Sequence, residues 1–384
     1  MKNRYIWLAA TGHLFTDLNQ GAVPALLPFF ISEYHLSYAA AAGLVAALSI
    51  ASTVIQPLFG FYADRLSKPW MIPAGVGMAG CGVAFSTLLP DYWFAVAMIV
   101  LSGIGIAAFH PEGARLVHYH AGEKKATAMS VFAVGGQTGI ALGPIMAAVV
   151  VSAWGLRGTA FLAIPFLLMA AFLAYQLTGT GGGQAGAKNA AAVQEGEKKI
   201  DLWTPFAILT GVVIIRSVIF YGLNTFIPLY WINVYHQSTT SAGTALSIMF
   251  GAGVAGTLWG GRLADRYGHR RIVLIGYAAL TPLLILFVYV RDVLLATALL
   301  VPIGIVLLST LSPLVVMGQK FLPNRVGLAS GITLGVAISI GGIVAPLLGH
   351  IADGHGLPAA LTVLSFLTVP AVLLTLMLPR PQAK

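Results

Sequence analysis

Long apolar runs, each of about the length that crosses a lipid bilayer, alternate with short polar segments along this chain. They are too long for the strands of a membrane barrel, and they lack the strict apolar–polar alternation of such strands. We therefore predict an all-α membrane protein with twelve transmembrane helices. The spans are expected near residues 5–32, 39–64, 70–89, 92–117, 125–153, 158–178, 204–233, 239–264, 271–290, 293–319, 326–352 and 357–379.

A short charged turn occurs once in each half of the chain. Residues 60–65 read GFYADR, and residues 261–266, which begin 201 positions later, read GRLADR. Prolines repeat at nearly the same interval, as Pro28 with Pro228, Pro111 with Pro313 and Pro144 with Pro346. Such repetition is typical of transporters built from two related halves. We predict two pseudo-symmetric six-helix bundles, over 1–178 and 204–384, joined by a cytoplasmic linker over 179–203.

Composition places the chain in lipid. Hydrophobic residues make up 58% of it and charged residues only 9%, whereas a soluble domain carries about 25% charged residues. The net charge of +9 does not indicate nucleic-acid binding, because the basic residues are spread over short loops. Cys81 is the only cysteine, so no intramolecular disulfide can form. The first apolar run carries Asp17 and exceeds signal-peptide length, so we expect it to be a retained span.

The positive-inside rule predicts that both termini are cytoplasmic. Only Arg157 and Arg291 fall on the opposite side, and Arg216 falls inside a span. The side predicted to be cytoplasmic collects Lys2, Arg4, Arg65, Lys68, Arg115, Lys124, Lys125, Lys188, Lys198, Lys199, Arg262, Arg266, Arg270, Arg271, Lys320, Arg325, Arg380 and Lys384.

Polar residues in the first predicted span form one stripe. Asp17 lies about 18 Å into the span at 1.5 Å per residue, near the middle of a hydrocarbon core of about 30 Å. His13 and Gln20 lie one turn away on the same face. A carboxylate at this depth is costly and should face a cavity or a partner. We expect Asp17 to be a protonation site; the alternative is a static hydrogen bond between helices.

Polar residues in other spans are further candidates for binding and proton coupling. Arg216 cannot lose its proton, so it needs an anionic substrate or a carboxylate such as Asp17 or Glu112. His110 and Glu112 flank Pro111 and are candidates for proton relay, with a structural cap on a kinked helix as the alternative. The expected substrate-binding set is His13, Asp17, Gln20, Arg115, Gln137, Arg216, Tyr221 and Asn224.

No catalytic signature is present in the sequence. There is no cysteine–histidine metal spacing, no phosphate-binding glycine loop of the nucleotide type and no nucleophile elbow. We therefore expect no enzyme activity, no cofactor and no metal. Gly135, Gly139, Gly143 and Pro144 lie at a spacing that favours close helix packing, with a sliding surface as the functional extension.

These residues resemble the major facilitator superfamily. The Gly-x-x-x-Asp-Arg turn is similar to its most general signature, and residues 139–148 (GIALGPIMAA) are similar to its antiporter motif. A narrower resemblance is to the fosmidomycin-resistance family, through HLFTD at 13–17, FHPE at 109–112 and QKFLP at 319–323. One departure is the absence of the Arg that drug antiporters carry early in span 4, where residues 101–105 read LSGIG.

The resemblance implies a secondary transporter with a site between its halves. The leading expectation is proton-coupled export of a small anionic drug-like or metabolic compound, such as the phosphonate fosmidomycin. The alternatives are uptake or exchange of a small organic anion and, less favoured, a sensor that does not transport. Gly60, Asp64, Arg65, Gly261, Asp265 and Arg266 are then expected to form conformational latches. The expected partners are protons, the substrate and membrane lipid, for a monomer in a bacterial inner membrane.

Overall fold

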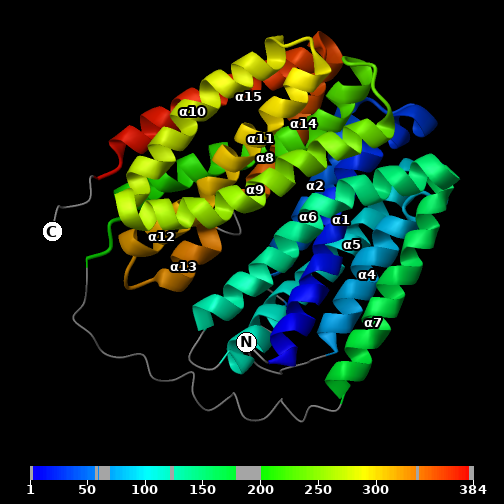
Figure 1. The fold of residues 1–384 in the computed structure, drawn as a ribbon, viewed down its shortest axis with the longest axis horizontal. Helices are drawn as coiled ribbons and strands as arrows, with labels where there is room; N and C mark the ends of the chain where they lie inside the picture. Colours follow the sequence, from blue (N-terminus) through cyan, green and yellow to red (C-terminus); the bar gives the residue numbers. More distant parts are fainter. Residues whose placement is uncertain are drawn as a thin grey trace. The chain divides into compact units, whose positions relative to one another are not determined.

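We describe a computed structural model over residues 3–56, 59, 70–121, 125–178, 200–333 and 337–379 (Figure 1). The described residues contain helices and turns but no strand. Most of the predicted linker, together with Gly60, Asp64 and Arg65, lies outside them. The chain forms two compact units, one from Met1–Leu26 with Ala47–Glu197 and one from Leu27–Ala46 with Lys198–Lys384.

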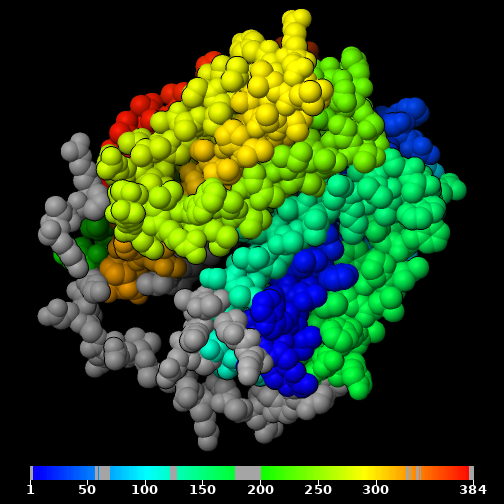
Figure 2. All heavy atoms as spheres, viewed as in Figure 1, coloured from blue at the N-terminus to red at the C-terminus, as the bar shows by residue number. Residues whose placement is uncertain are grey.

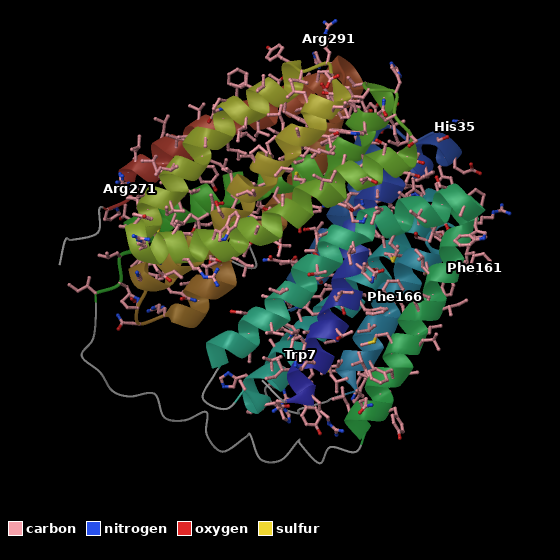
Figure 3. All side chains as sticks on the ribbon, in the orientation of Figure 1. Trp7, His35, Phe161, Phe166, Arg271 and Arg291 are labelled. Carbon is pink, nitrogen blue, oxygen red and sulfur yellow. The ribbon has the colours of Figure 1, made fainter. Side chains whose placement is uncertain are left out.

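Long helices pack around an aromatic core in the first unit. Figure 1 shows α4 beside both α5 and α7. The buried core includes Phe109, Phe132 and Phe166, and Figure 3 shows Phe166 directed inward from α7 while Phe161 points outward. α1 (Arg4–Tyr34) and α2 (Tyr38–Val54) each contribute residues to both units. The other helices of the first unit are α4 (Met71–Phe85), α5 (Tyr92–His120), α6 (Lys125–Trp154), the 3-10 helix η1 (Leu156–Leu162) and α7 (Ala163–Thr178).

In the second unit, α8 packs against both α14 and α15. Trp231 and Tyr230, the two largest fully buried side chains, pack with Phe287 beside Tyr235. Arg271 and Arg291 lie at opposite ends of α10 (Figure 3). The helices are α8 (Trp203–Asn233), α9 (Thr239–Tyr267), α10 (His269–Tyr289), α11 (Val293–Ser309), α12 (Leu311–Phe321), α13 (Val326–Gly331), α14 (Ala337–His355) and α15 (Leu357–Met377).

The predicted span over 293–319 divides at Thr310 into α11 and α12. In the first half, the corresponding helix α5 stays continuous although it contains Pro111. The Thr310 hydroxyl donates to the Leu307 carbonyl oxygen at 2.8 Å, so it satisfies a carbonyl at the end of α11. Thr310 is fully buried, and its hydroxyl also accepts from Arg216 Nε at 3.2 Å.

The exterior of the helices is apolar, as a chain solvated by lipid requires. Eight helices among the described residues are long and apolar enough to cross a membrane, and α2 and α4 are shorter apolar helices. Large apolar side chains such as Leu168, Leu294 and Phe366 are more than half exposed. Figure 2 shows α1 (blue) bordering α6 (cyan-green) on the visible face. The chain is a multi-pass membrane protein with an all-α fold.

The internal repeat extends to turn geometry. His35 and His236 both have positive φ, at 51° and 52°, and Gly155 and Gly356 have φ of 70° and 84°. Each pair is 201 residues apart. Two helix caps repeat at the same interval, because Ser37 and Ser238 each cap the following helix at 3.1 Å, and Asp91 and Asp292 do so at 2.6 and 2.8 Å. The turns were thus duplicated together with their cap chemistry.

Candidate functional site

The stripe predicted on the first span forms a cluster with a residue of α5. Asp17 Oδ2 lies 3.1 Å from His13 Nε2, and Asp17 Oδ1 lies 3.1 Å from His110 Nε2. Gln20 donates from Nε2 to the same Oδ1 at 2.8 Å. The three titratable side chains are 6–19% exposed. The carboxylate near the centre of the helix therefore has three polar partners, as a charge at membrane depth requires.

The hydrogen bonds of His13 fix how many protons the cluster holds. His13 Nδ1 lies 2.7 Å from the main-chain oxygen of Phe132, which can only accept, so Nδ1 must carry a hydrogen. The other nitrogen faces a carboxylate oxygen, which also accepts unless it is protonated. A proton must therefore lie between His13 and Asp17. The arrangement describes an imidazolium beside a carboxylate, or a neutral imidazole beside a carboxylic acid.

Packing between α1 and α6 positions the His13 ring. The ring stacks on Phe132 with centroids 4.1 Å apart, and the ring of His110 meets it edge-on at 5.0 Å. Gly136 leaves the space that the imidazole fills, because a Cβ there would overlap His13 Nε2. Phe132 and His110 thus hold the imidazole ring of His13 in place, and this fixes the directions of its two nitrogens.

The predicted packing glycines of α6 lie against the main chain of α1. A Cβ added to Gly135, Gly139 or Gly143 would overlap the carbonyl oxygens of Ala10, Leu14 and Leu18 respectively. The main chains therefore touch over successive turns, and only glycine permits this approach. Because α6 carries Phe132, the same contact sets the distance from its carbonyl to His13.

The donor atoms of His13, Asp17 and His110 lie within 4.8 Å of one another, so these three residues could hold a divalent metal ion. Imidazole and carboxylate are common zinc ligands. A shared proton accounts for the same contacts, because both carboxylate oxygens already have partners at hydrogen-bond distance. The absence of a metal stays a prediction.

Glu112 and Arg115 form the ion pair that their spacing on α5 allows. Arg115 Nε donates to Glu112 Oε2 at 2.8 Å, and a second bond joins Arg115 Nη2 to Glu112 Oε1. Glu112 is 1% exposed. His110 points away from this pair and toward Asp17. Glu112 and Arg115 therefore neutralise each other, which favours His110 over Glu112 as a proton carrier.

Arg216 lies in the interior of the second unit. It is 4% exposed and donates from Nε to the Thr310 hydroxyl at 3.2 Å, and its guanidinium lies 5.8 Å from the centre of the Phe220 ring. Among the described residues no carboxylate forms an ion pair with it. Tyr277 and Tyr221 are close enough to influence the guanidinium electrostatically. A buried cation without an anion is costly, so this position calls for a negative partner.

The remaining predicted residues have varied surroundings. Asn224 is buried, and its Oδ1 has no hydrogen-bond partner within the described ranges, whereas Gln137 is half-buried. Asp265 lies 3.5 Å from His269 in the adjoining helix, with its side chain 80% exposed. Arg266 stacks over Tyr267, and the position of Gly261 is open space. In the Asp-Arg turn of the second half, Asp265 and Arg266 thus contact residues that follow them closely in the sequence.

Three contributors were not predicted from the sequence. The Phe132 main-chain oxygen fixes the His13 tautomer, and a main-chain atom leaves no residue-type signal. Thr310 follows Ser309 three residues before Pro313, a pattern that could have suggested a break in the helix. Tyr277 is fully buried, and its hydroxyl lies beside Thr310 without a hydrogen bond of acceptable geometry. For Thr310 and Tyr277, the signal that could have been used was a polar side chain inside a predicted span.

Comparison of the sequence with known proteins identifies related chains that align over nearly the whole length. The chain is 29% identical to the uncharacterized MFS-type transporter YfnC of Bacillus subtilis and 28% identical to the fosmidomycin resistance protein of Escherichia coli. Each alignment covers 96% of this chain, and 91% and 90% of the respective relative.

Solved structures agree on the fold. The structure matches a bacterial homologue of the human lysosomal transporter Spinster, in an inward-facing and occupied conformation, with a TM-score of 0.84. The two are 14% identical, and the match covers 98% of this chain and 97% of the other. A mutant of the nucleoside transporter NupG matches with a TM-score of 0.75 at 18% identity, over 98% and 99% of the chains. Because residues 9–346 also match the family's sequence profile, the chain belongs to the Major Facilitator Superfamily.

Proposed function

We propose that this protein is a proton-coupled secondary transporter that exports a small organic anion. Membership of the Major Facilitator Superfamily supports transport of a small molecule in general. Proton coupling and the anionic substrate rest on two groups of side chains, one in each compact unit. No catalytic role is proposed for either group.

The contacts of His13 with the Phe132 carbonyl and with Asp17, which together require a shared proton, are the observation that carries the proposal. With that proton, an imidazolium, a carboxylate and a neutral His110 add up to no net charge. Without it, the cluster carries one negative charge at low dielectric, where charge interactions are several-fold stronger than in water. Loss and gain of one proton therefore change the local electrostatics sharply. His110 offers a route for that proton, because its Nε2 reaches the same carboxylate.

Arg216 is the proposed anion-binding residue. Its guanidinium is buried, always charged and without a carboxylate partner among the described residues. Asp17 already has two histidines and Gln20, and Glu112 already has Arg115, so neither carboxylate requires Arg216. A phosphonate or carboxylate substrate would supply the missing charge. Tyr221 and Asn224 are further proposed binding residues of the same unit, and Gln20 and Gln137 are proposed binding residues of the first unit.

Fosmidomycin is the proposed test substrate, because one relative is named for resistance to it. The bacterial relatives support a location in a bacterial inner membrane, and the distribution of Lys and Arg supports an orientation with both termini in the cytoplasm. We propose that it acts as a monomer.

Purified protein in liposomes with a pH-sensitive dye on the inside would test this function. An imposed proton gradient should drive fosmidomycin movement against its own gradient, and addition of fosmidomycin should in turn move protons. An uncoupler should abolish both effects. Fosmidomycin movement that ignores the uncoupler would refute proton coupling, and proton movement driven by cations alone would refute the anionic substrate.

Uptake or exchange of an organic anion is the alternative on the same residues. It is distinguished by the sign of the proton change on substrate binding, since an antiporter releases protons when substrate binds and a symporter takes them up. A non-transporting sensor would bind the anion and show no flux in either direction.

A further inference from the structure

His13, Asp17 and His110 place three potential metal ligands close together within the first compact unit. Asp17 Oδ2 lies 3.1 Å from His13 Nε2, and Asp17 Oδ1 lies 3.1 Å from His110 Nε2. Ligand atoms about 2.0 Å from a tetrahedral zinc ion lie about 3.3 Å from one another. Two edges of such a site are therefore nearly in place. The third joins the two imidazoles, whose ligand atoms lie within 4.8 Å of each other, and it needs one ring to move inward.

The supporting hydrogen bonds are those of a metal site. Histidines that bind a metal almost always donate their other ring N–H to a carbonyl or a carboxylate. The Nδ1 hydrogen of His13 meets the Phe132 carbonyl oxygen in this way, so a neutral ring presents the lone pair of Nε2 to Asp17. Gln20 in turn orients the carboxylate, because its Nε2 donates to Asp17 Oδ1 at 2.8 Å. Two of the three ligands are therefore held in position before any ion arrives.

A metal ion meets the same electrostatic demand as the shared proton. Once Nδ1 of His13 holds its hydrogen, His13 Nε2 and the Asp17 carboxylate are both acceptors, and positive charge must lie between them. A proton supplies that charge at one point, and a dication would supply it at the centre of all three ligands. Because only deprotonated ligands bind a metal, the two occupants exclude each other.

The ligand set selects the class of ion. Imidazole suits zinc, copper, iron and nickel, whereas magnesium and calcium take oxygen ligands. Two imidazoles and one carboxylate also leave one position of a four-coordinate ion open for water. Each of the three side chains keeps some exposure, and His110 keeps the most, so an ion can reach the ligand atoms.

We propose that His13, Asp17 and His110 bind a divalent transition-metal ion such as Zn²⁺, and that this ion inhibits transport. The binding rests on the geometry of the ligand atoms. The inhibition rests also on the proposed function, because the ion takes the place of the proton that couples transport. The ion is a reversible inhibitor and not a resident cofactor, so the expectation that transport itself needs no metal is unchanged.

Cobalt is the probe for binding, because Co²⁺ replaces zinc at such sites and absorbs visible light far more strongly there than in water. The full-length protein is purified without a histidine tag, and Cys81→Ser removes its one thiol. In detergent, we expect Co²⁺ to give a visible band that saturates at one ion per chain. Zn²⁺ should abolish the band, and Mg²⁺ should not.

His13→Gln and His110→Gln each remove one imidazole and keep a polar side chain. Each should weaken Co²⁺ binding at least about tenfold, since even the loss of a hydrogen bond that supports a metal ligand costs that much. His269→Gln is the matched control. His269 also lies one helical turn from an aspartate, Asp265, but no third ligand joins that pair in the described part of the chain. The control should bind Co²⁺ as the parent does.

Thermal unfolding shows whether the variants fold. Zn²⁺ should raise the unfolding temperature of the parent and of the control, because it binds the native state, and should raise it less in the two ligand variants. If only one ligand variant unfolds cooperatively, that variant decides the outcome.

The absence of a cobalt band in the parent would overturn the proposal, and so would displacement of Co²⁺ by Mg²⁺. Unchanged binding in both ligand variants, or an equal loss in His269→Gln, would overturn it too, because the ion would then lie elsewhere.

Inhibition is measured in the liposome assay. Zn²⁺ in excess over fosmidomycin should stop proton-coupled flux, and a chelator should restore it. Cobalt binding without proton coupling would refute the proposed function and leave the metal site standing. Proton coupling without cobalt binding would refute the metal site alone, and binding that leaves coupled flux unchanged would refute the inhibitory role.

Discussion

At the scale of single residues, the chemistry of this protein is concentrated in two buried groups. Asp17 is held by His13, His110 and Gln20, and Arg216 is held by Thr310 and Phe220. The first group can change its charge by gaining or losing a proton, whereas the second cannot. A transporter that couples protons to an anion needs one group of each kind.

Replacing Asp17 by Asn should separate folding from proton coupling. The Asn amide can donate to His13 Nε2 and so satisfies the cluster without the shared proton. We expect a folded, membrane-inserted protein whose proton-driven transport falls by at least about tenfold, given the usual contribution of a positioned proton carrier. Proton flux in liposomes measures the effect, with Asp91→Asn as a control that removes a carboxylate charge at a helix start and keeps the capping oxygen. Full pH-dependent transport in Asp17→Asn would move the role to His110.

Replacing Arg216 by Gln should abolish anion binding, because a fixed charge at low dielectric attracts anions strongly. Arg216→Lys should retain part of the affinity if charge matters more than bidentate geometry. Binding and thermal stability must be measured on the same purified variant. Arg291→Gln is the control, since it removes an exposed arginine. Equal loss of stability and binding would indicate a structural role, and unchanged binding would exclude Arg216 from the site.

At the scale of helices, the sequence predicts the elements well and their interruptions poorly. Most predicted spans coincide with described helices to within a few residues, because apolar length is the signal that lipid itself imposes. The span predicted over 293–319 is one apolar stretch of membrane-spanning length, Val293–Phe321, and only the turn at Thr310 within it was not predicted. The hydrogen bond from the Thr310 hydroxyl to the Leu307 carbonyl is a local feature that hydropathy does not register.

The contact between α1 and α6 gives a prediction at this scale. Gly139→Val should destabilise the protein by about 1–3 kcal/mol, the usual cost of overpacking, because its Cβ would overlap the Leu14 carbonyl oxygen. Gly251→Ala is the matched control: its position on α9 is open space, and alanine favours a helix over glycine by about 1 kcal/mol. Thermal unfolding in detergent measures both. A Gly139→Val protein as stable as the parent would show that the two main chains need not touch.

At the scale of the whole molecule, repetition and charge pattern carry most of the information. The interval of about 200 residues predicts two related halves, and the turns at His35 and His236 repeat in geometry as well as in sequence. The fold of the Major Facilitator Superfamily was predictable for this reason. The site was predictable only in part. The side chains are visible in the sequence, but the contact with the Phe132 carbonyl depends on how helices distant in sequence meet.

The predicted topology can be tested through the linker. A protease site inserted between Gly181 and Glu197, residues outside the described ranges, should be cleaved only from the cytoplasmic side. The insertion should leave transport intact, because polar linker sequences such as this one generally tolerate insertion. A site placed beside Arg291 should show the reverse accessibility. Cleavage of the linker from outside the cell would overturn the assignment of both termini to the cytoplasm.

The hydrogen bond from His13 to the Phe132 carbonyl determines which contact changes when the shared proton is lost. A neutral imidazole has one hydrogen for two acceptors, the main chain of α6 on one side and Asp17 on the other. It can satisfy either neighbour, but not both at once. When the hydrogen stays on the nitrogen that faces Asp17, the hydrogen bond from His13 on α1 to the Phe132 carbonyl on α6 is lost. The stacking of His13 on Phe132 and the close main-chain contact at the glycines remain, so loss of the shared proton removes one specific contact between α1 and α6 and leaves the others in place.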